Sequence, residues 1–249
     1  LSVQQAVDTV NIDSMVWHLQ RLSGEVPVDV GNGDETIASR YQSNAGNALA
    51  QAWLQQQFTN MGYAPTVQVF GTSGANIIVE KPGVTHPERK VIICAHYDDM
   101  PGGPVNAPGA DDNGSGVCAV LEAARIMASL SFENTVVFAL WDQEEEGLIG
   151  STYYASVAGG NDDQISAVVN MDAIGYDGDA DGLLRIFTGP VANSEAIKDS
   201  ALSVNATYGL DLSICGEDPG APVFYHISFW GEGYGALTIA EDYDNDINP

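Results

Sequence analysis

The chain has 249 residues, of which 45% are hydrophobic, enough for one large α/β domain or two smaller ones. Its 34 aspartates and glutamates outnumber 8 lysines and arginines, which gives a formal net charge of −26. Such a charge repels nucleic acids and anionic membranes, and no stretch approaches the roughly 20 apolar residues of a membrane span. We therefore expect no nucleic-acid partner and no membrane span, whereas metal cations suit this charge.

The pattern of apolar residues predicts alternating helices and strands. Residues 7–24 are predicted to form a helix that ends at Gly24, and residues 43–62 a second one that ends at Gly62. The later predicted elements are strands at 66–70, 76–80 and 91–95, a helix at 115–130, a strand at 135–141, a helix at 151–158, and strands at 165–171 and 235–240. Strands that are apolar on both faces are typical of a mostly parallel sheet covered by helices on both sides. We expect one α/β domain over residues 1–249.

Ionisable side chains follow three of these strands directly. "VIICA" is followed by His96 and Asp98, and "ISAVVNM" by Asp172. "TVVFALW" is followed by an acidic segment, and the loop "PGADDNGSG" adds two more carboxylates; these are Asp142, Glu144, Glu145, Glu146, Asp111 and Asp112. Ligands of open α/β sheets bind beyond the carboxyl ends of the strands. We therefore expect one imidazole and several carboxylates to meet at one edge of the sheet.

Crowded carboxylates repel one another, and a divalent cation is the natural counter-charge. Histidine with aspartate and glutamate, without cysteine, suits a catalytic zinc ion better than a structural one. Two simpler explanations stay open for the single segments. "ADDNGSG" alone is also typical of a turn with a helix cap, and "EEE" alone of the first turn of a helix.

From about Arg40 to its last residue, the chain resembles the co-catalytic dizinc exopeptidases of family M28, in particular secreted bacterial leucyl-type aminopeptidases. The segments that carry the resemblance are "AHYD", "PGADDNGSG", "EEEGLIGS", "NMDAIGY" and "HISFWGEGYGALTIAED". The resemblance implies the zinc-exopeptidase fold, which is phosphorylase/hydrolase-like. It also implies two zinc ions and peptide or protein substrates with a free N-terminus.

The same resemblance implies a role for each matched residue. His96 would bind one zinc ion, Asp172 the same ion or the other, and Asp112 would bridge the two. Glu145 would bind the second ion, and Glu144 would be the general base. Asp98 would orient His96, and an unusual cis peptide bond is expected between Asp112 and Asn113.

The chain departs from the family pattern at its C-terminus. The family's fifth zinc ligand is a histidine in a "YHT"-like segment after an "NP", and this chain ends at "DINP". His226 matches a structural histidine of the family instead. We therefore expect the fifth ligand to be absent from this chain, apparently with the segment that carries it. Uneven zinc occupancy and doubtful activity of the 249-residue form are expected to follow.

A second acidic segment lies outside the zinc set. In "DGDADG", Asp177, Asp179 and Asp181 alternate ahead of Gly182 like the first half of a calcium loop, although Thr188 occupies the twelfth place, where such loops carry glutamate. A calcium site and a solvated acidic turn are both compatible with this segment.

Two other functions stay open. A glutaminyl cyclase works on the same fold with a single zinc ion, and a non-catalytic binding ectodomain is the alternative from another class. The acidic composition and the absence of a basic, apolar leader favour a secreted protein, and we expect a monomer. Three cysteines, Cys94, Cys118 and Cys215, are too few for a disulfide framework. Cys94 in a predicted strand and Cys118 on the apolar face of a predicted helix are expected to be buried thiols.

Overall fold

The computed structural model describes residues 2–100, 103, 105–210, 212–217, 226–243 and 246, with the backbone alone over 214–217. Its helices are α1 (Val3–Val7), α2 (Ile12–Leu22), α3 (Ala45–Asn60), α4 (Gly114–Met127), α5 (Ile149–Gly160), α6 (Ser194–Tyr208) and α7 (His226–Gly231). Its strands are β1 (Val28–Asp29), β2 (Asp34–Glu35), β3 (Thr66–Phe70), β4 (Gly74–Lys81), β5 (His86–His96), β6 (Asn134–Trp141), β7 (Gln164–Asp172), β8 (Leu183–Phe187), β9 (Ser213–Glu217) and β10 (Ala236–Glu241).

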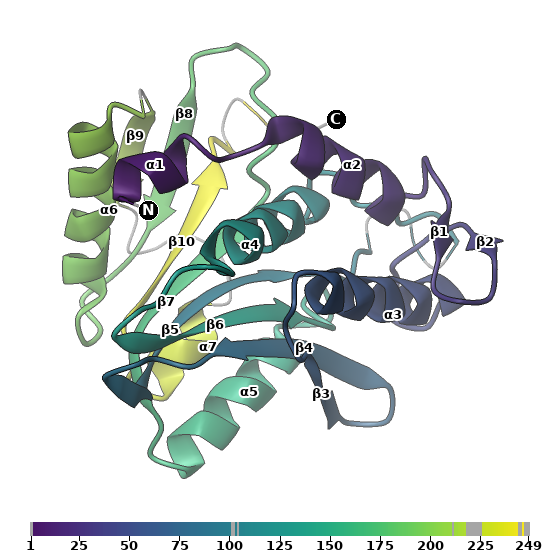
Figure 1. Ribbon diagram of the computed structural model, residues 1–249, viewed down its shortest axis with the longest axis horizontal. Coiled ribbons are helices and arrows are strands. Elements are labelled where there is room, and N and C mark those ends of the chain that lie inside the picture. Colours follow the sequence, from purple (N-terminus) through teal and green to yellow (C-terminus); the bar gives the residue numbers. More distant parts are fainter. Residues whose placement is uncertain are drawn as a thin grey trace.

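Eight of the strands form one sheet in the order β3-β4-β6-β5-β7-β10-β8-β9 (Figure 1). The central strands β6, β5, β7 and β10 run parallel to one another, and β8 runs parallel to β9. Antiparallel pairs join β3 to β4, β4 to β6, and β10 to β8. The parallel centre places the carboxyl ends of β5, β6 and β7 side by side. The fold is thus a mixed α/β sheet whose centre is parallel, as the apolar strands predicted.

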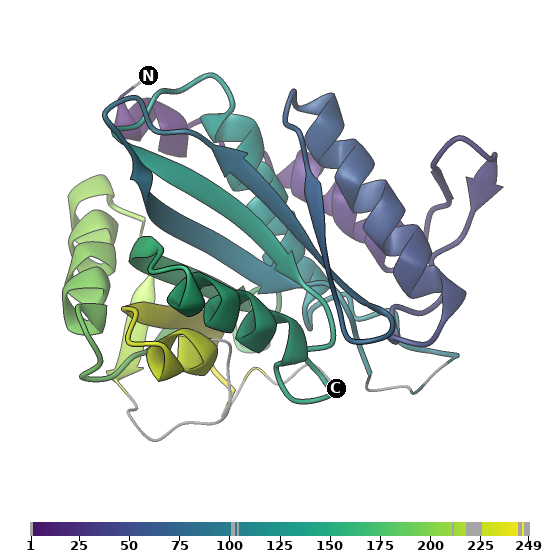
Figure 2. The same cartoon turned by 90° about the horizontal axis from the view of Figure 1, so that it is seen from below.

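Helices cover both faces of the sheet. α2, α3 and α4 lie on one face, and α5 and α7 lie on the other, where Figure 2 shows them in front of the strands. The alternating side chains of β6 fill both cores: Phe138 packs in the cluster under α3 and α4, and Trp141 in the cluster under α5 and α7. Both residues are fully buried. Burial on both faces explains why these strands are apolar at almost every position.

Several predicted boundaries differ from the structure. The helix predicted over residues 7–24 begins only at Ile12, because Asn11 is extended and its side chain accepts a hydrogen bond from the Ser14 N–H as an N-cap. A separate short helix, α1, precedes it. β8, α6 and β9 were not predicted. Within the described residues, no helix is long and apolar enough to cross a membrane.

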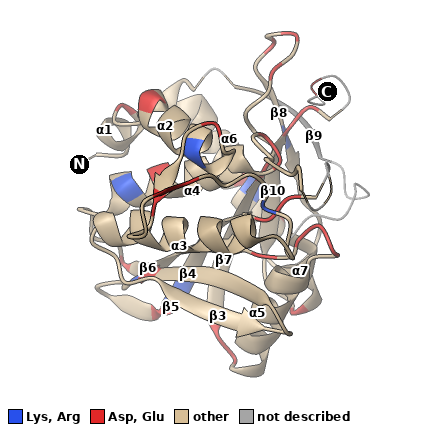
Figure 3. Cartoon of the chain, turned by 90° about the vertical axis from the view of Figure 1, so that its right-hand side faces the viewer, with Lys and Arg blue, Asp and Glu red and all other residues tan. Residues whose placement is uncertain are grey.

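The acidic residues recur in loops and at the ends of helices and strands (Figure 3). Basic side chains are few, and one of them, Arg40, is fully buried, with 0% of its surface exposed. The two cysteines whose side chains are described, Cys94 and Cys118, are free buried thiols as expected. Burial raises the pKa of each thiol to about 12, so both stay protonated at neutral pH.

Candidate metal centre

His96 is the last residue of β5 and only 1% exposed. Its Nδ1 donates to the backbone oxygen of Asp98 over 3.1 Å and lies 3.3 Å from Oδ1 of the same residue. This fixes the ring so that Nε2 faces two other carboxylates, 2.9 Å from Oδ1 of Asp112 and 3.7 Å from Oδ1 of Asp172. Burial lowers the pKa of His96, but hydrogen bonds with these three carboxylates outweigh burial and raise it well above its ordinary value. A positive charge is therefore favoured between these side chains.

Asp112 lies in the loop that leads into α4, and the Asp112–Asn113 peptide bond is cis, as expected. The Asn113 side chain ties this loop to the end of β7. It donates to the backbone oxygen of Met171 over 2.9 Å, and its oxygen accepts from the N–H groups of Gly116 and Ala173. One asparagine thus caps α4 and holds the Asp112 loop against the strand that delivers Asp172.

Asp172 is the last residue of β7 and is 4% exposed. Burial raises its pKa to about 6; Asp112 and Asp98 act in the same direction, while His96 opposes them. The ligand atoms of His96, Asp112 and Asp172 all lie within 4.8 Å of one another. One imidazole and two carboxylates in this arrangement match the donor set of a catalytic zinc site.

Asp98 joins this group to the segment after β6. Besides its contact with His96, it accepts from the N–H of Glu144 over 3.1 Å and from the N–H of Glu145 over 3.3 Å. It is 1% exposed and serves three partners at once. Asp98 is thus placed to orient the imidazole and to hold both glutamates at the same edge of the sheet.

Glu144 and Glu145 are partly buried beside this group. Burial raises the pKa of Glu144 to about 8, with Asp172, Asp98 and Glu145 adding to it and His96 opposing it. Burial and the charge of Asp112 raise the pKa of Glu145 to about 7. The buried Oε1 of Glu145 accepts no hydrogen bond from the described residues. A buried carboxylate oxygen without a donor is an observation that fits a cation as its partner.

The structure thus brings together His96, Asp112 and Asp172, and Asp98 ties the backbone of Glu144 and Glu145 to this group. Glu145 does not belong to the close group of His96, Asp112 and Asp172 among the residues described. Asp142, which the strand pattern also directed to this edge, is turned inward; its side chain accepts from Asn47, Ala75 and Gln143. Its role in the structure is to join three backbone segments.

Sequence reasoning missed several residues around the centre. Asn113 was named only for its peptide bond, and Arg40 and Asn47 were not considered as site residues. Tyr243 also lies near: burial first, and then the charges of Asp172 and Asp112, raise the pKa of its phenol well above the ordinary value. Asparagine is a common helix cap, so its position before α4 was a usable signal for Asn113. Arg40 had no such signal.

The other three histidines lie outside the group. His226 shares a 2.8 Å hydrogen bond with Oγ1 of Thr238, which agrees with a structural role. His86 lies 3.4 Å from Glu88 at the surface, and Nδ1 of His18 donates to the backbone of its own helix. The C-terminal "NP" of the family pattern, residues 248–249, lies outside the described residues.

The predicted calcium segment also gathers carboxylates. Asp177, Asp179 and Asp181 lie with Asp246, which was not predicted, so that one oxygen of each is within 4.8 Å of the others. Asp246 is 1% exposed and accepts from the N–H of Gly178 over 2.8 Å. The other three are exposed, and N–H groups of the same turn donate to Asp177 and Asp179.

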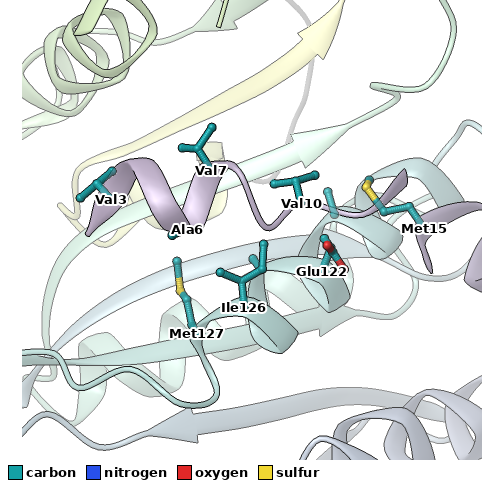
Figure 4. Close-up of a pocket in the computed structure, with 10 residues that line it drawn as sticks. Val3, Ala6, Val7, Val10, Met15, Glu122, Ile126 and Met127 are labelled. Atoms are coloured by element: carbon teal, nitrogen blue, oxygen red, sulfur yellow. The ribbon is translucent and has the colours of Figure 1, made fainter. Parts of the chain in front are cut away.

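An apolar cavity of about 360 Å³ lies away from the centre, between α1 and α4 (Figure 4). Val3, Ala6 and Val7 line it from α1, and Ile126 and Met127 from α4. Its lining offers the ionisable side chain of Glu122 alone, which is engaged by Arg125 at 2.6 Å. This cavity is a packing gap under α1, and it contributes nothing to the acidic centre.

The sequence matches the family model described as Peptidase family M28 over residues 76–222. A leucine aminopeptidase 2 of Trichophyton equinum is 34% identical over 129 residues, which are 48% of this chain and 25% of that protein. The chain spans well under half the length of the curated relatives that it matches, up to 42%.

Many solved structures share the fold, and two of them are enzymes of different activity. The Legionella pneumophila LapA aminopeptidase has a TM-score of 0.81 and 20% identity, and the match covers 99% of this chain and 65% of that one. The Porphyromonas gingivalis glutaminyl cyclase has a TM-score of 0.73 and 21% identity, with 96% and 87% covered. At these identities the likeness is one of fold.

Proposed function

This chain belongs to peptidase family M28, and on that premise we propose that it is a zinc-dependent aminopeptidase, which hydrolyses the N-terminal peptide bond of peptides or proteins. One observation carries the proposal: His96, Asp112 and Asp172 present their ligand atoms to a common point, with Glu144 beside them. A leucine aminopeptidase among the relatives supports the reaction class. The absence of cysteine from the group favours zinc in a catalytic role.

We assign each side chain one task. His96 and Asp172 would hold one ion, Asp112 would be shared, and Glu145, whose buried oxygen accepts no hydrogen bond from the described residues, would hold the second. Bound zinc ions would supply Lewis-acid stabilisation of the negative charge that develops on the scissile carbonyl oxygen. Asp98 keeps the His96 ring oriented through Nδ1.

Glu144 is the proposed general base. It takes a proton from the attacking water and passes it to the leaving amine, which requires a carboxylate that does not bind metal. Its raised pKa, about 8, has burial as its first cause and neighbouring carboxylates as the next. Cations held by those carboxylates would offset their charge and favour the ionised base.

The experiment is an assay of amino acid release from unblocked peptides and from the same peptides with acetylated N-termini, before and after chelation. We expect release from the free peptides only, loss with chelator, and recovery on addition of zinc. Full activity in a preparation whose metal content is zero by elemental analysis would exclude the proposal.

The single-zinc glutaminyl cyclase remains the second candidate. The cyclase match covers 87% of that chain, and the close three-ligand group suits one ion. The two reactions give different products: a cyclase releases ammonia from N-terminal glutamine, and an aminopeptidase releases a free amino acid. A non-catalytic domain would release neither, although it could still bind zinc.

Calcium binding at Asp177, Asp179, Asp181 and Asp246 stays a prediction, supported by the gathering of four carboxylates. A calcium titration followed by thermal unfolding, with Asp181→Asn as the comparison, tests it. A secreted, monomeric protein is proposed from the net charge of −26, which favours solubility and disfavours association. Sedimentation and fractionation of the producing cells test these two points.

A further inference from the structure

Arg40 lies in the interior of the protein, which is unusual for an arginine side chain. It precedes α3 and is 0% exposed, although most arginines lie at the surface. The N–H groups of its guanidinium donate hydrogen bonds to backbone oxygens. Nε donates to the oxygen of Tyr97 over 2.6 Å, and Nη2 donates to the oxygen of Gly109 over 2.8 Å. Nη1 donates to the oxygens of Leu22, over 3.3 Å, and Pro108.

Three of these acceptors, Tyr97, Pro108 and Gly109, belong to the segments that deliver the predicted ligands. Tyr97 lies between His96 and Asp98 at the end of β5, and Gly109 lies three positions before Asp112 in the loop to α4. The guanidinium therefore links the two segments directly. Only a planar group with several diverging N–H donors can reach both carbonyls at the same time.

The backbone of Arg40 strengthens the same link. Its N–H donates to Ala107, in the Asp112 loop, over 2.8 Å, and its oxygen accepts from the Asp99 N–H over 3.3 Å. That oxygen also accepts from Nδ2 of Asn47, which donates in turn to Asp142. One residue thus contacts the segments after β5 and before α4 through both its backbone and its side chain.

Gly109 supplies an independent sign that the fit is close. Its φ is +46°, and a Cβ there would lie 2.3 Å from the oxygen of Asp112, 2.5 Å from Nη2 of Arg40 and 2.6 Å from Cγ of Asp99. No side chain larger than hydrogen fits between these groups without displacing one of them. The loop at Gly109 is in van der Waals contact with the guanidinium that holds it.

We propose that Arg40 is a positioning residue of the metal centre, which sets the separation between His96 and Asp112 by holding their two backbone segments together. This inference rests on the proposed zinc site. Arg40 touches no reacting atom; it acts through the carbonyls of Tyr97 and Gly109. Removing it should let the Asp112 loop relax away from β5, which lengthens the distance between two ligands that share an ion.

The test compares zinc affinity and the visible spectrum of the cobalt-substituted protein for the wild type, Arg40→Lys and Gly109→Ala. Lysine keeps the positive charge, but its ammonium group cannot reproduce the planar set of N–H donors that reaches the oxygens of both Tyr97 and Gly109. We expect zinc affinity to fall at least 10-fold in both variants and the cobalt bands to shift, because the spectrum reports ligand geometry. Arg125→Lys is the control, since the Arg125 guanidinium also donates to a backbone oxygen, that of Thr9, but it pairs with Glu122 and lies away from the centre.

A wild-type protein without zinc affinity would refute the proposed function itself. If the wild type binds zinc while both folded variants keep its affinity within twofold and its cobalt spectrum, the positioning role is wrong. If Arg40→Lys does not fold, Arg40 serves the whole fold and the inference is overturned. Gly109→Ala alone does not support it, because its Cβ would press on the oxygen of Asp112 directly.

Discussion

His96 and Asp98 lie two positions apart on the chain, and Asp98 contacts Nδ1 of His96 with both a backbone and a side-chain oxygen, at 3.1 and 3.3 Å. The carboxylate that orients the imidazole also accepts from the N–H groups of Glu144 and Glu145. A single aspartate therefore connects the ligand of β5 with the glutamates after β6.

We expect Asp98→Asn to weaken zinc binding about 10- to 100-fold, because the amide presents a donor where the ring and the two N–H groups need an acceptor. Competition with a zinc-binding dye measures the change. Asp34→Asn, at an exposed strand residue, is the control. Unchanged affinity would mean that the backbone oxygen of Asp98 orients the ring alone.

Glu144→Gln is expected to fold, to keep its zinc and to lose turnover by about 100-fold or more, the range for loss of a general base. Metal analysis and steady-state kinetics on the same preparation measure both properties. Loss of zinc from this variant, with zinc retained in Glu145→Gln, would show that the base and ligand assignments are reversed.

Two zinc ions are expected to bind with unequal affinity. His96, Asp112 and Asp172 form a close group, whereas Glu145 lies outside it in the described structure. We expect calorimetric titration to resolve one tight and one weaker ion, with Asp172→Asn weakening the tight one and Glu145→Gln the other. Equal affinity for both ions would contradict the prediction of one tight and one weaker site.

Burial of His226 leads us to predict that the free energy of unfolding depends on pH. Burial lowers its pKa to about 4, below the ordinary value of 6.5, so the unfolded chain takes up a proton that the folded chain refuses. Stability from this group is complete above pH 6.5 and is lost as the pH falls towards 4. Each unit of pKa shift corresponds to about 1.4 kcal/mol, so the loss is about 3 kcal/mol.

Urea unfolding of the wild type and of His226→Gln at pH 7 and pH 4.5 measures this effect. We expect the stability difference between the two proteins to shift in favour of the glutamine variant at the lower pH. A difference that does not change with pH would mean that His226 takes up its proton at the same pH in the folded and the unfolded protein, so that burial does not lower its pKa.

The apolar cavity between α1 and α4 leads us to predict a substitution that stabilises the protein. Ala6→Leu would fill part of the cavity lined by Ile126 and Met127, and partial burial of the added carbons contributes about 1 kcal/mol. We expect amide hydrogen exchange in α1 to slow about fivefold. Gln4→Leu, at an exposed position of the same helix, is the control and should leave exchange unchanged.

The parts of the fold that periodicity could predict are those buried on both faces. β6, the second half of β5 and most of β7 are apolar, and the ends of β5 and β7 carried His96 and Asp172 as plain signals. α6 was missed because its buried residues in the described structure, Ser194 and Lys198, are polar, so its sequence shows little of an apolar stripe. Packing here follows tertiary context, which residue type alone does not indicate.

The predicted ligand residues could be found from the sequence because their chemistry is unusual at strand ends. The residues that position them could not be found in this way. Arg40 bonds to backbone oxygens, and any residue can offer those. Asn47 lies within an ordinary helical segment, and only the folded chain brings it to Asp142. Residue identity does not encode which distant carbonyl a donor will meet.

The order of the central strands has a consequence for biosynthesis. β5 lies between β6 and β7, so the chain first adds one neighbour and then passes to the other side to add the second. Asp172, at the end of β7, is the last of the close group to leave the ribosome. The complete group can therefore capture metal only after β7 has been made and placed beside β5, and we expect a chain refolded in the presence of a chelator to regain its fold first and its zinc after the chelator is removed.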